Sequence, residues 1–199
     1  MNSVLHVRPF ILKFSCVKYC KREWPLFSFL LLCSDAAVFT TRGNHTIGHK
    51  YKKVLFREYE DANFQKEKPH PSYLGFLGPI LKGEVGDTIV VHFKNKAKGN
   101  FSVHPHGVFY SKDSEGALYV DETKGASKKD DHVPLNGEHT YTWRITKDHA
   151  PTGDDDDCLT WIYHSHVLPH KDINTGLIGE IKLENVSVFS MSRERVIKR

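Results

Sequence analysis

Two short histidine pairs are the residues of this chain whose types and spacing favour metal chemistry. His104 and His106 form one pair, His164 and His166 form the other, and one residue separates the two imidazoles of each pair. In an extended strand, side chains two residues apart lie on the same face, so both rings of a pair can reach one locus. Imidazole nitrogen suits copper, zinc, iron and nickel, whereas calcium and magnesium prefer oxygen. The spacing predicts a transition-metal site, and it differs from the i, i+4 pair of zinc proteases.

Either pair alone is equally consistent with ordinary strand or loop histidines, because the chain contains 13 histidines. Two pairs of the same form make that interpretation much less favourable. Three stretches around them, YLGFLGPILKGEVGD (73–87), HPHGVFYSKDSEGALY (104–119) and LTWIYHSHVLPHKDINTGLIG (159–179), resemble the first cupredoxin domain of multicopper ferroxidases, the family of hephaestin and ceruloplasmin. The resemblance runs from about Val38 to about Asn185.

The resemblance implies a role in copper binding for each histidine. His104 would bind a type 2 copper, and His106, His164 and His166 would bind a type 3 pair. A trinuclear cluster of this kind needs eight histidines, so the other half would come from a further cupredoxin domain with an H-C-H motif. In that motif the cysteine holds a type 1 copper. Ser165 stands at the matching position here, and its hydroxyl cannot replace a soft thiolate, so we expect no type 1 copper.

Cys158 is a poor candidate for a type 1 copper ligand. A blue-copper site requires a cysteine followed closely by a histidine and an axial methionine, whereas Met1 and Met191 stand at the ends of the chain. In the family, the cysteine that matches Cys158 pairs with one about 26 residues later, where this chain has Glu184. The resemblance implies that this bridge is lost or replaced. The sequence leaves open which cysteines pair with one another among Cys16, Cys20, Cys33 and Cys158.

A carboxylate-rich stretch follows the first histidine pair. Adjacent aspartates near backbone carbonyls supply the hard oxygen ligands that calcium prefers. The resemblance implies a calcium site made by the carbonyls of Lys112 and Ser127 and the side chains of Asp130 and Asp131. A solvated charged loop is the alternative interpretation.

Two further roles rest on position and resemblance. Glu115 lies nine residues after His106, near the place where related oxidases keep an acid beside the copper cluster. Because dioxygen reduction consumes protons, we hypothesise that Glu115 relays them. A fainter resemblance implies a sodium ion bound by the carbonyls of Phe39, Gly48 and Tyr51.

Length and composition agree with one compact domain. The chain has 199 residues, of which 39% are hydrophobic and 12% aromatic, enough to fill a core. Its net charge of +4 is small and the charges alternate in sign, with no basic stripe and no nucleic-acid motif. These features argue against binding to nucleic acid.

Short β-rich runs alternate with turn residues along the chain. Tyr141, Trp143 and Ile145 alternate with polar residues, which indicates a strand with one face on the core and the other in water. Turn residues include Lys82-Gly83 and Asn136-Gly137. The sequence predicts an all-β fold, a cupredoxin-like antiparallel Greek-key sandwich. The predicted strands are 54–59, 88–94, 139–145, 159–163 and 177–183.

The ends of the chain resemble the family less than its middle does and indicate a shortened form. We divide the chain into a divergent N-terminal segment (1–37), a cupredoxin domain (38–187) and a divergent C-terminal tail (188–199). The apolar run 26–33 is too short to span a bilayer and has three open interpretations: an imperfect signal peptide, a strand at the sandwich edge, or a disordered tail. Sequons at Asn44, Asn100 and Asn185 favour an extracellular or membrane-associated location, with the domain outside.

Two functions of different classes are consistent with these residues. The resemblance implies part of a ferroxidase-like oxidase, which oxidises Fe(II) and reduces O2 to water once further cupredoxin domains complete the copper site. The lone chain is then expected to be inactive. The alternative is a non-catalytic interaction module similar to the A domains of the coagulation cofactors. Such a module does not need both histidine pairs, so the full set of four favours the oxidase.

Overall fold

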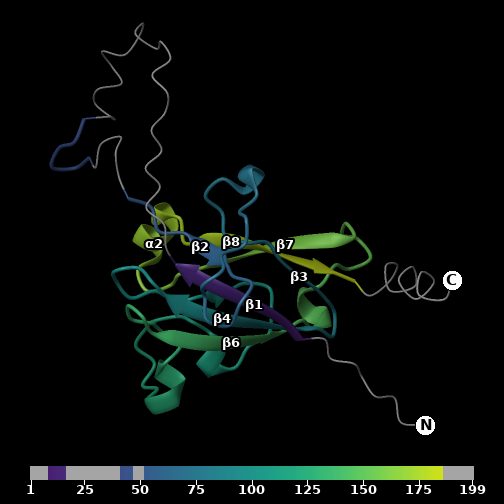
Figure 1. Ribbon diagram of the computed structural model, residues 1–199. Helices are drawn as coiled ribbons and strands as arrows, with labels where there is room; N and C mark the ends of the chain where they lie inside the picture. Colours follow the sequence, from purple (N-terminus) through teal and green to yellow (C-terminus); the bar gives the residue numbers. More distant parts are fainter. Residues whose placement is uncertain (1–8, 17–40, 47–51, 186–199) are drawn as a thin grey trace, which may run out of the picture.

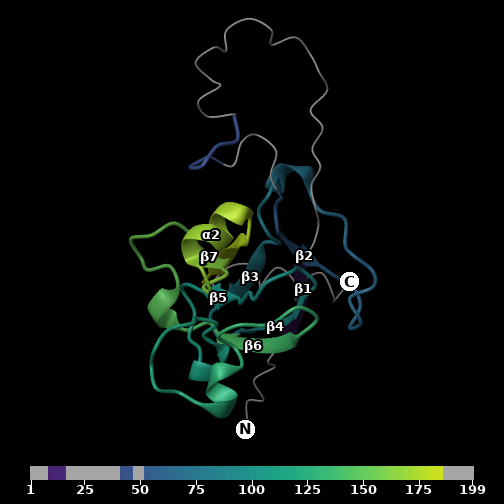
Figure 2. The same ribbon diagram turned by 90° about the vertical axis from the view of Figure 1, so that its left-hand side faces the viewer.

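The computed structural model describes residues 9–16, 41–46 and 52–185. Within these ranges, two four-stranded sheets pack face to face (Figure 1 and Figure 2). The first sheet has the strand order β2-β1-β4-β6, and the second has the order β3-β8-β7-β5. The strands are β1 (Pro9–Cys16), β2 (Phe56–Glu58), β3 (Leu81–Glu84), β4 (Thr88–Asn95), β5 (His104–Pro105), β6 (Glu138–Arg144), β7 (Cys158–His164) and β8 (Ile178–Glu184).

The helices of the described residues are short. Four are 3-10 turns: η1 (Ser72–Leu74), η2 (Lys112–Ser114), η3 (Gly125–Lys128) and η4 (Lys147–His149). The α-helix α2 (Pro169–Thr175) begins three residues after His166 and lies beside the end of β7 (Figure 2). None of these helices is long and apolar enough to cross a membrane. The predicted all-β class is confirmed.

Side-chain alternation explains why the sheets form where they do. In β4 and β8 every second residue is buried, and the intervening ones are only partly so. This period of two places one face of each strand on the core. All five predicted strand runs are found within one or two residues of their predicted bounds.

The sheets differ from a purely antiparallel arrangement in two places. β1 runs parallel to β4, and β3 runs parallel to β8. Moreover, Lys82 and Gly83, predicted as a turn, lie inside β3. A Cβ added to Gly83 would lie 2.3 Å from Ile145 Cδ1, so this glycine marks close packing between the sheets and not a turn.

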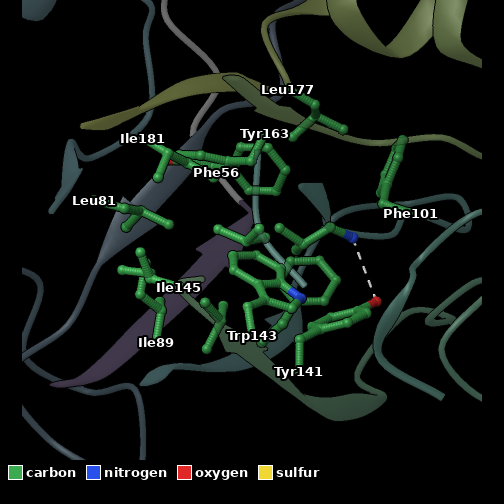
Figure 3. Packing of buried hydrophobic residues seen from close by; sticks show 14 of the residues in the cluster. Phe56, Leu81, Ile89, Phe101, Tyr141, Trp143, Ile145, Tyr163, Leu177 and Ile181 are labelled. Carbon is green, nitrogen blue, oxygen red and sulfur yellow. Dashed lines mark hydrogen bonds between the residues drawn. The ribbon is translucent and has the colours of Figure 1, made fainter. Parts of the chain in front are cut away.

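The core between the sheets is aromatic and has few unpaired polar atoms. Figure 3 shows Trp143 and Tyr141 of β6 facing Tyr163, Ile181 and their neighbours from the opposite sheet. The Trp143 Nε1–H donates to Ser114 O at 2.9 Å, and the Tyr163 hydroxyl donates to Pro79 O at 2.7 Å. Because each buried aromatic has a partner for its polar end, these large side chains can be fully enclosed.

β1 lies within residues 1–37, which the sequence set apart from the cupredoxin domain. It is an inner strand of its sheet, antiparallel to β2 on one side and parallel to β4 on the other. The run 26–33 and the tail 188–199 lie outside the described residues. Their interpretations and the division at residue 38 stay predictions.

Candidate metal centre

The pairing of β5 with β7 brings the two histidine pairs together. These strands are antiparallel neighbours, and their register places His104 directly opposite His164. The His106 N–H donates to Ile162 O at 2.9 Å and so continues the pairing beyond the end of β5. The centroids of neighbouring imidazole rings lie 5.0–5.7 Å apart. The four rings therefore converge on one place.

Two ring nitrogens face each other inside this histidine cluster. Nε2 of His106 and Nε2 of His164 are 3.0 Å apart. Metal–imidazole bonds are about 2.0–2.1 Å long, so both nitrogens can reach a single ion placed between them. His164 is buried, whereas His106 is exposed, so one side of the cluster is open.

Hydrogen bonding and burial prepare the rings as neutral ligands. His104 Nδ1 donates to Glu115 O at 2.6 Å, which leaves the Nε2 lone pair free for a metal. Burial lowers the pKa of His104 to about 4, and burial together with the neighbouring rings lowers the pKa of His106 and that of His164. Since metals bind the neutral imidazole, these residues fit a metal at neutral pH.

His166 adds a second sign that the cluster suits an ion. Its Nδ1 is buried and has no hydrogen-bond partner among the described residues. An orphaned buried polar atom is costly and needs an explanation, such as a bound ion. Within the described ranges, no three histidine, cysteine or carboxylate side chains are arranged to hold one metal ion.

A buried network of small polar side chains fixes the two histidine pairs relative to each other. The Ser165 hydroxyl donates to Asp172 Oδ2 at 2.8 Å and accepts from the Ser102 N–H at 3.2 Å. In turn, the Ser102 hydroxyl accepts from the His166 N–H at 3.0 Å, and Asp172 Oδ2 also accepts from the Leu168 N–H at 3.0 Å. Sequence reasoning missed Ser102 and Asp172 because they lie 64 residues before and six after His166.

Gly107 allows the chain to turn directly after His106. Its φ is 72°, a left-handed conformation that favours glycine, and an added Cβ would lie 2.3 Å from the Trp161 ring. The Trp161 Nε1–H donates to His149 O at 3.2 Å, so this ring is itself held in place. A side chain at position 107 would therefore clash with Trp161 of β7, and glycine is required there.

Comparison with known proteins identifies the family. A family model described as "Multicopper oxidase" matches residues 73–187. The chain belongs to the multicopper oxidase family.

Relatives of known name agree with this assignment. This multicopper oxidase domain is 53% identical over 146 residues to the human ferroxidase HEPHL1 and 53% identical to mouse hephaestin, in each case over 73% of this chain and 13% of the relative. It is also 53% identical over 131 residues to human coagulation factor V, over 66% of this chain and 6% of that protein. The chain thus spans about an eighth or less of the length of these relatives.

Solved structures of low sequence identity share the fold. A multicopper oxidase from Pseudomonas thermotolerans matches with a TM-score of 0.50 and 15% identity, over 92% of this chain and 31% of the other. A multicopper oxidase from Campylobacter jejuni matches with a TM-score of 0.51 and 16% identity, over 94% of this chain and 28% of the other. The predicted cupredoxin-like fold is confirmed.

The predicted calcium residues of this multicopper oxidase domain lie in a compact acidic cluster. We define this acidic cluster as Glu115, Asp121, Asp130 and Asp131 with the ammonium groups of Lys112 and Lys128. Asp130 and Asp131 are fully buried, so these two carboxylates are not solvated. Ser127 lies beside Lys128 in η3, and Lys112 begins η2.

Ion pairs organise the acidic cluster. Lys112 Nζ lies 2.7 Å from Asp121 Oδ2, and Lys128 Nζ lies 2.8 Å from Asp121 Oδ1 and 2.7 Å from Asp131 Oδ2. Asp130 Oδ1 is buried and has no hydrogen-bond or ion-pair partner among the described residues. Sequence reasoning missed Asp121; the only available signal was one more acidic residue between the two predicted ligand stretches.

Glu115 touches the histidine cluster through its backbone and not through its carboxylate. Its carbonyl accepts from His104, whereas its carboxylate accepts from Lys112 at 2.8 Å and from the Tyr119 hydroxyl at 2.8–2.9 Å. Burial acts to raise the pKa of the Glu115 carboxyl, but the hydrogen bonds from Lys112 and Tyr119 outweigh it and lower the pKa. The proton relay stays a prediction.

Cys158 begins β7, at the end of this strand opposite to His164. Cys158 pairs in register with Glu184 across β7 and β8, forms no disulfide with any described residue, and has a pKa raised by burial. Phe39, Gly48 and Tyr51, predicted to bind sodium, lie outside the described residues, so that site stays a prediction.

Proposed function

We propose that this chain is a copper-binding cupredoxin domain of a ferroxidase-like multicopper oxidase and supplies half of a trinuclear copper site. His104 would bind the type 2 copper, and His106, His164 and His166 would bind the type 3 pair. The observation that carries the proposal is the facing of two Nε2 atoms at 3.0 Å within a cluster of four imidazoles. Two nitrogens are fewer than the three or four protein ligands usual for a metal site, so another domain would complete each ion.

Copper supplies one-electron steps, which suit both Fe(II) oxidation and O2 reduction. The overall reaction consumes four Fe(II), one O2 and four protons, and yields four Fe(III) and two waters. In the proposed oxidase, this chain holds the four imidazoles in their neutral form and orients them toward the open side of the histidine cluster. A partner domain with an H-C-H motif supplies the other ligands and the type 1 site, so the lone chain is inactive.

Copper titration of the full chain tests this proposal. We expect His106→Ala and His164→Ala each to weaken copper binding roughly 10- to 100-fold, the usual effect of losing a ligand or its support. His170→Ala is the matched control, because His170 is an exposed histidine of α2 outside the cluster. Equal affinity across the ligand variants and the control would reject the ligand assignment.

Iron oxidation then tests the half-site. Fe(III) formation and O2 consumption are measured for the chain alone and after mixing with a domain that carries H-C-H. The proposal predicts turnover only in the mixture. Robust turnover by the lone chain would contradict it.

A non-catalytic interaction module is the alternative, and the similarity to human coagulation factor V supports it. The two functions differ in what the histidine cluster must do. If the chain is such a module, the mixture with an H-C-H domain yields no oxidation, and His106→Ala and His164→Ala keep partner binding intact.

A structural calcium ion at the acidic cluster is a second part of the proposal. With all four carboxyls ionised, the cluster carries four negative and two positive charges, a net −2 that suits a divalent cation. Asp130 Oδ1 offers an oxygen without a partner. Calcium should therefore raise the thermal unfolding midpoint of the full chain but not that of Asp131→Asn. Asp156→Asn, in the exposed acidic run 154–157, is the control; a response equal in all three would reject the site.

We place the domain outside the cell, either secreted or membrane-associated. Asn44, Asn100 and Asn185, the glycan acceptors of the three sequons, are all exposed. Treatment of the protein from secreting cells with a glycosidase should reduce its apparent mass.

A further inference from the structure

A single peptide group connects a buried carboxylate to the ring of His104. This peptide joins Glu115 and Gly116. Its C=O accepts a hydrogen bond from His104 Nδ1 at 2.6 Å, and its N–H donates to Asp130 Oδ2 at 2.8 Å. Because the C=O and N–H of a trans peptide point in opposite directions, Asp130 and His104 lie at the two ends of one planar unit.

The surroundings hold this peptide in one position. Gly116 has a φ of 67°, and a Cβ added there would lie 2.3 Å from Val103 O, so only glycine fits. The Tyr141 hydroxyl donates to Asp130 O at 2.9 Å and accepts from the Val103 N–H at 3.3 Å, the dashed line of Figure 3. Tyr141 therefore sets the distance between Asp130 and the strand that carries His104.

We propose that Asp130 is a positioning residue for His104. Acting through the Glu115–Gly116 peptide, its carboxylate keeps the proton of the imidazole on Nδ1, fixes the ring plane, and directs Nε2 toward the histidine cluster. The statement about Nε2 as a copper ligand rests on the proposed function, whereas the tautomer and ring plane are properties of the metal-free chain.

The physical cause is polarisation in a dry environment. Asp130 is fully buried, which raises the pKa of its carboxyl, whereas the hydrogen bond from the Gly116 N–H acts to lower it. In the ionised form, this carboxylate accepts a hydrogen bond about twice as strong as a neutral acceptor does. A carboxylate on the N–H side makes the carbonyl on the other side a better acceptor, since chained hydrogen bonds strengthen one another by roughly 10–30%. Histidine ligands commonly donate a hydrogen bond from their second ring nitrogen to a carboxylate or a carbonyl. Here His104 donates to a carbonyl, and the same peptide group connects that carbonyl to a carboxylate.

The adjacent Asp131 provides the control for this role. It is as deeply buried as Asp130, but its Oδ2 pairs with Lys128, and the N–H of the Glu115–Gly116 peptide donates to Asp130 and not to Asp131. A general effect of removing a buried charge would appear in both variants. A specific effect on His104 would appear only at Asp130.

The experiment follows the ring nitrogens of His104 by NMR in the isotope-labelled full chain, free of metal and at neutral pH. In Asp130→Ala we expect the Nδ1 proton to exchange about 10-fold faster and part of the population to carry the proton on Nε2. In Asp130→Asn, which keeps an acceptor without the charge, we expect the tautomer to persist with an upfield shift of the Nδ1 proton. Asp131→Asn should leave both signals unchanged.

Two NMR results would contradict the role of Asp130 as a positioning residue for His104. It is wrong if the His104 ring signals of folded Asp130→Asn equal those of the unchanged chain, or if Asp131→Asn shifts them equally. Should Asp130→Ala fail to fold, the near-isosteric asparagine variant decides. Copper titration is the second readout: the loss should be about 10- to 100-fold for Asp130→Ala. If the unchanged chain bound no copper, the proposed function would fail, while the tautomer measurement would still decide the role of Asp130.

Discussion

Ser165 shows how one residue combines a chemical absence with a structural role. As a hydroxyl it cannot hold a type 1 copper, yet it is fully buried and joins the backbones of the two histidine pairs. The same side chain donates to Asp172 and accepts from the Ser102 N–H. From the sequence, Ser165 is notable only because it is not a cysteine. In the structure, its hydrogen bonds fix the two histidine pairs relative to each other.

Removing this hydroxyl should destabilise the fold measurably. Ser165→Ala leaves the Ser102 N–H buried without a partner and takes one donor from Asp172, which should lower the free energy of unfolding by about 1–3 kcal/mol. Urea unfolding measures the change. Ser72→Ala, at an exposed serine, is the matched control and should stay within about 0.5 kcal/mol of the unchanged chain. Equal stability of the two variants would show that the network contributes nothing.

Glu115 is close to the first histidine pair in the sequence, but its carboxylate does not contact the histidine rings by any hydrogen bond of the described residues. Its carboxylate is held by Lys112 and Tyr119, and its lowered pKa keeps it ionised at neutral pH. If it accepts protons on their way to the coppers, Glu115→Gln in the assembled oxidase should slow O2 reduction by roughly 100-fold. Because glutamine leaves the backbone carbonyl in place, His104 keeps its partner. Unchanged O2 consumption would reject the relay.

At the scale of elements, the register between β5 and β7 creates the site. Placing His104 opposite His164 is what converts two separate H-x-H motifs into one cluster. The motifs themselves, and the amphipathic strands β4, β6 and β8, could be predicted because period-two alternation is a local property. Local patterns could not predict the two parallel strand pairs or the strand conformation of Lys82 and Gly83. They also could not predict the hydrogen bonds by which Ser102 and Asp130 act on the histidine pairs. These features depend on partners far away in the chain, which a local pattern does not specify.

The pairing register of β7 with β8 predicts that a disulfide can be introduced between these strands. Cys158 and Glu184 are direct partners across antiparallel strands, and such pairs have Cα atoms about 4.5–5.5 Å apart, within the range that a disulfide bridges. Under oxidising conditions Glu184→Cys should form the bridge and stabilise the fold by about 2–4 kcal/mol. The measurements are a free-thiol assay and unfolding with and without reductant.

The prediction of a stabilising disulfide is wrong if the free-thiol assay still detects both thiols after oxidation. It is also wrong if the disulfide forms without any gain in stability. Lys182→Cys, opposite Thr160, is the control, because it adds a thiol to β8 without placing it opposite Cys158.

At the scale of the whole molecule, the proposed function makes the histidine cluster one half of a copper centre that two domains share. One side of the histidine cluster is open at His106, and the chain matches about 13% of the length of its ferroxidase relatives. The β-sandwich supplies rigidity, the polar network and Asp130 supply orientation, and a further domain would supply the remaining ligands. Activity is therefore expected to belong to the assembly, while copper affinity and ring geometry belong to this chain.

Titration of the isotope-labelled full chain with Cu(I), followed by NMR of the histidine ring nitrogens, tests whether His106 and His164 bind the same copper ion. Cu(I) is diamagnetic, so the ring signals remain observable. If they bind the same ion, the Nε2 signals of His106 and His164 will shift together with the first equivalent of copper, while those of the exposed His170 will not move. Independent responses of the His106 and His164 rings, or shifts no larger than that of His170, would contradict a shared copper site.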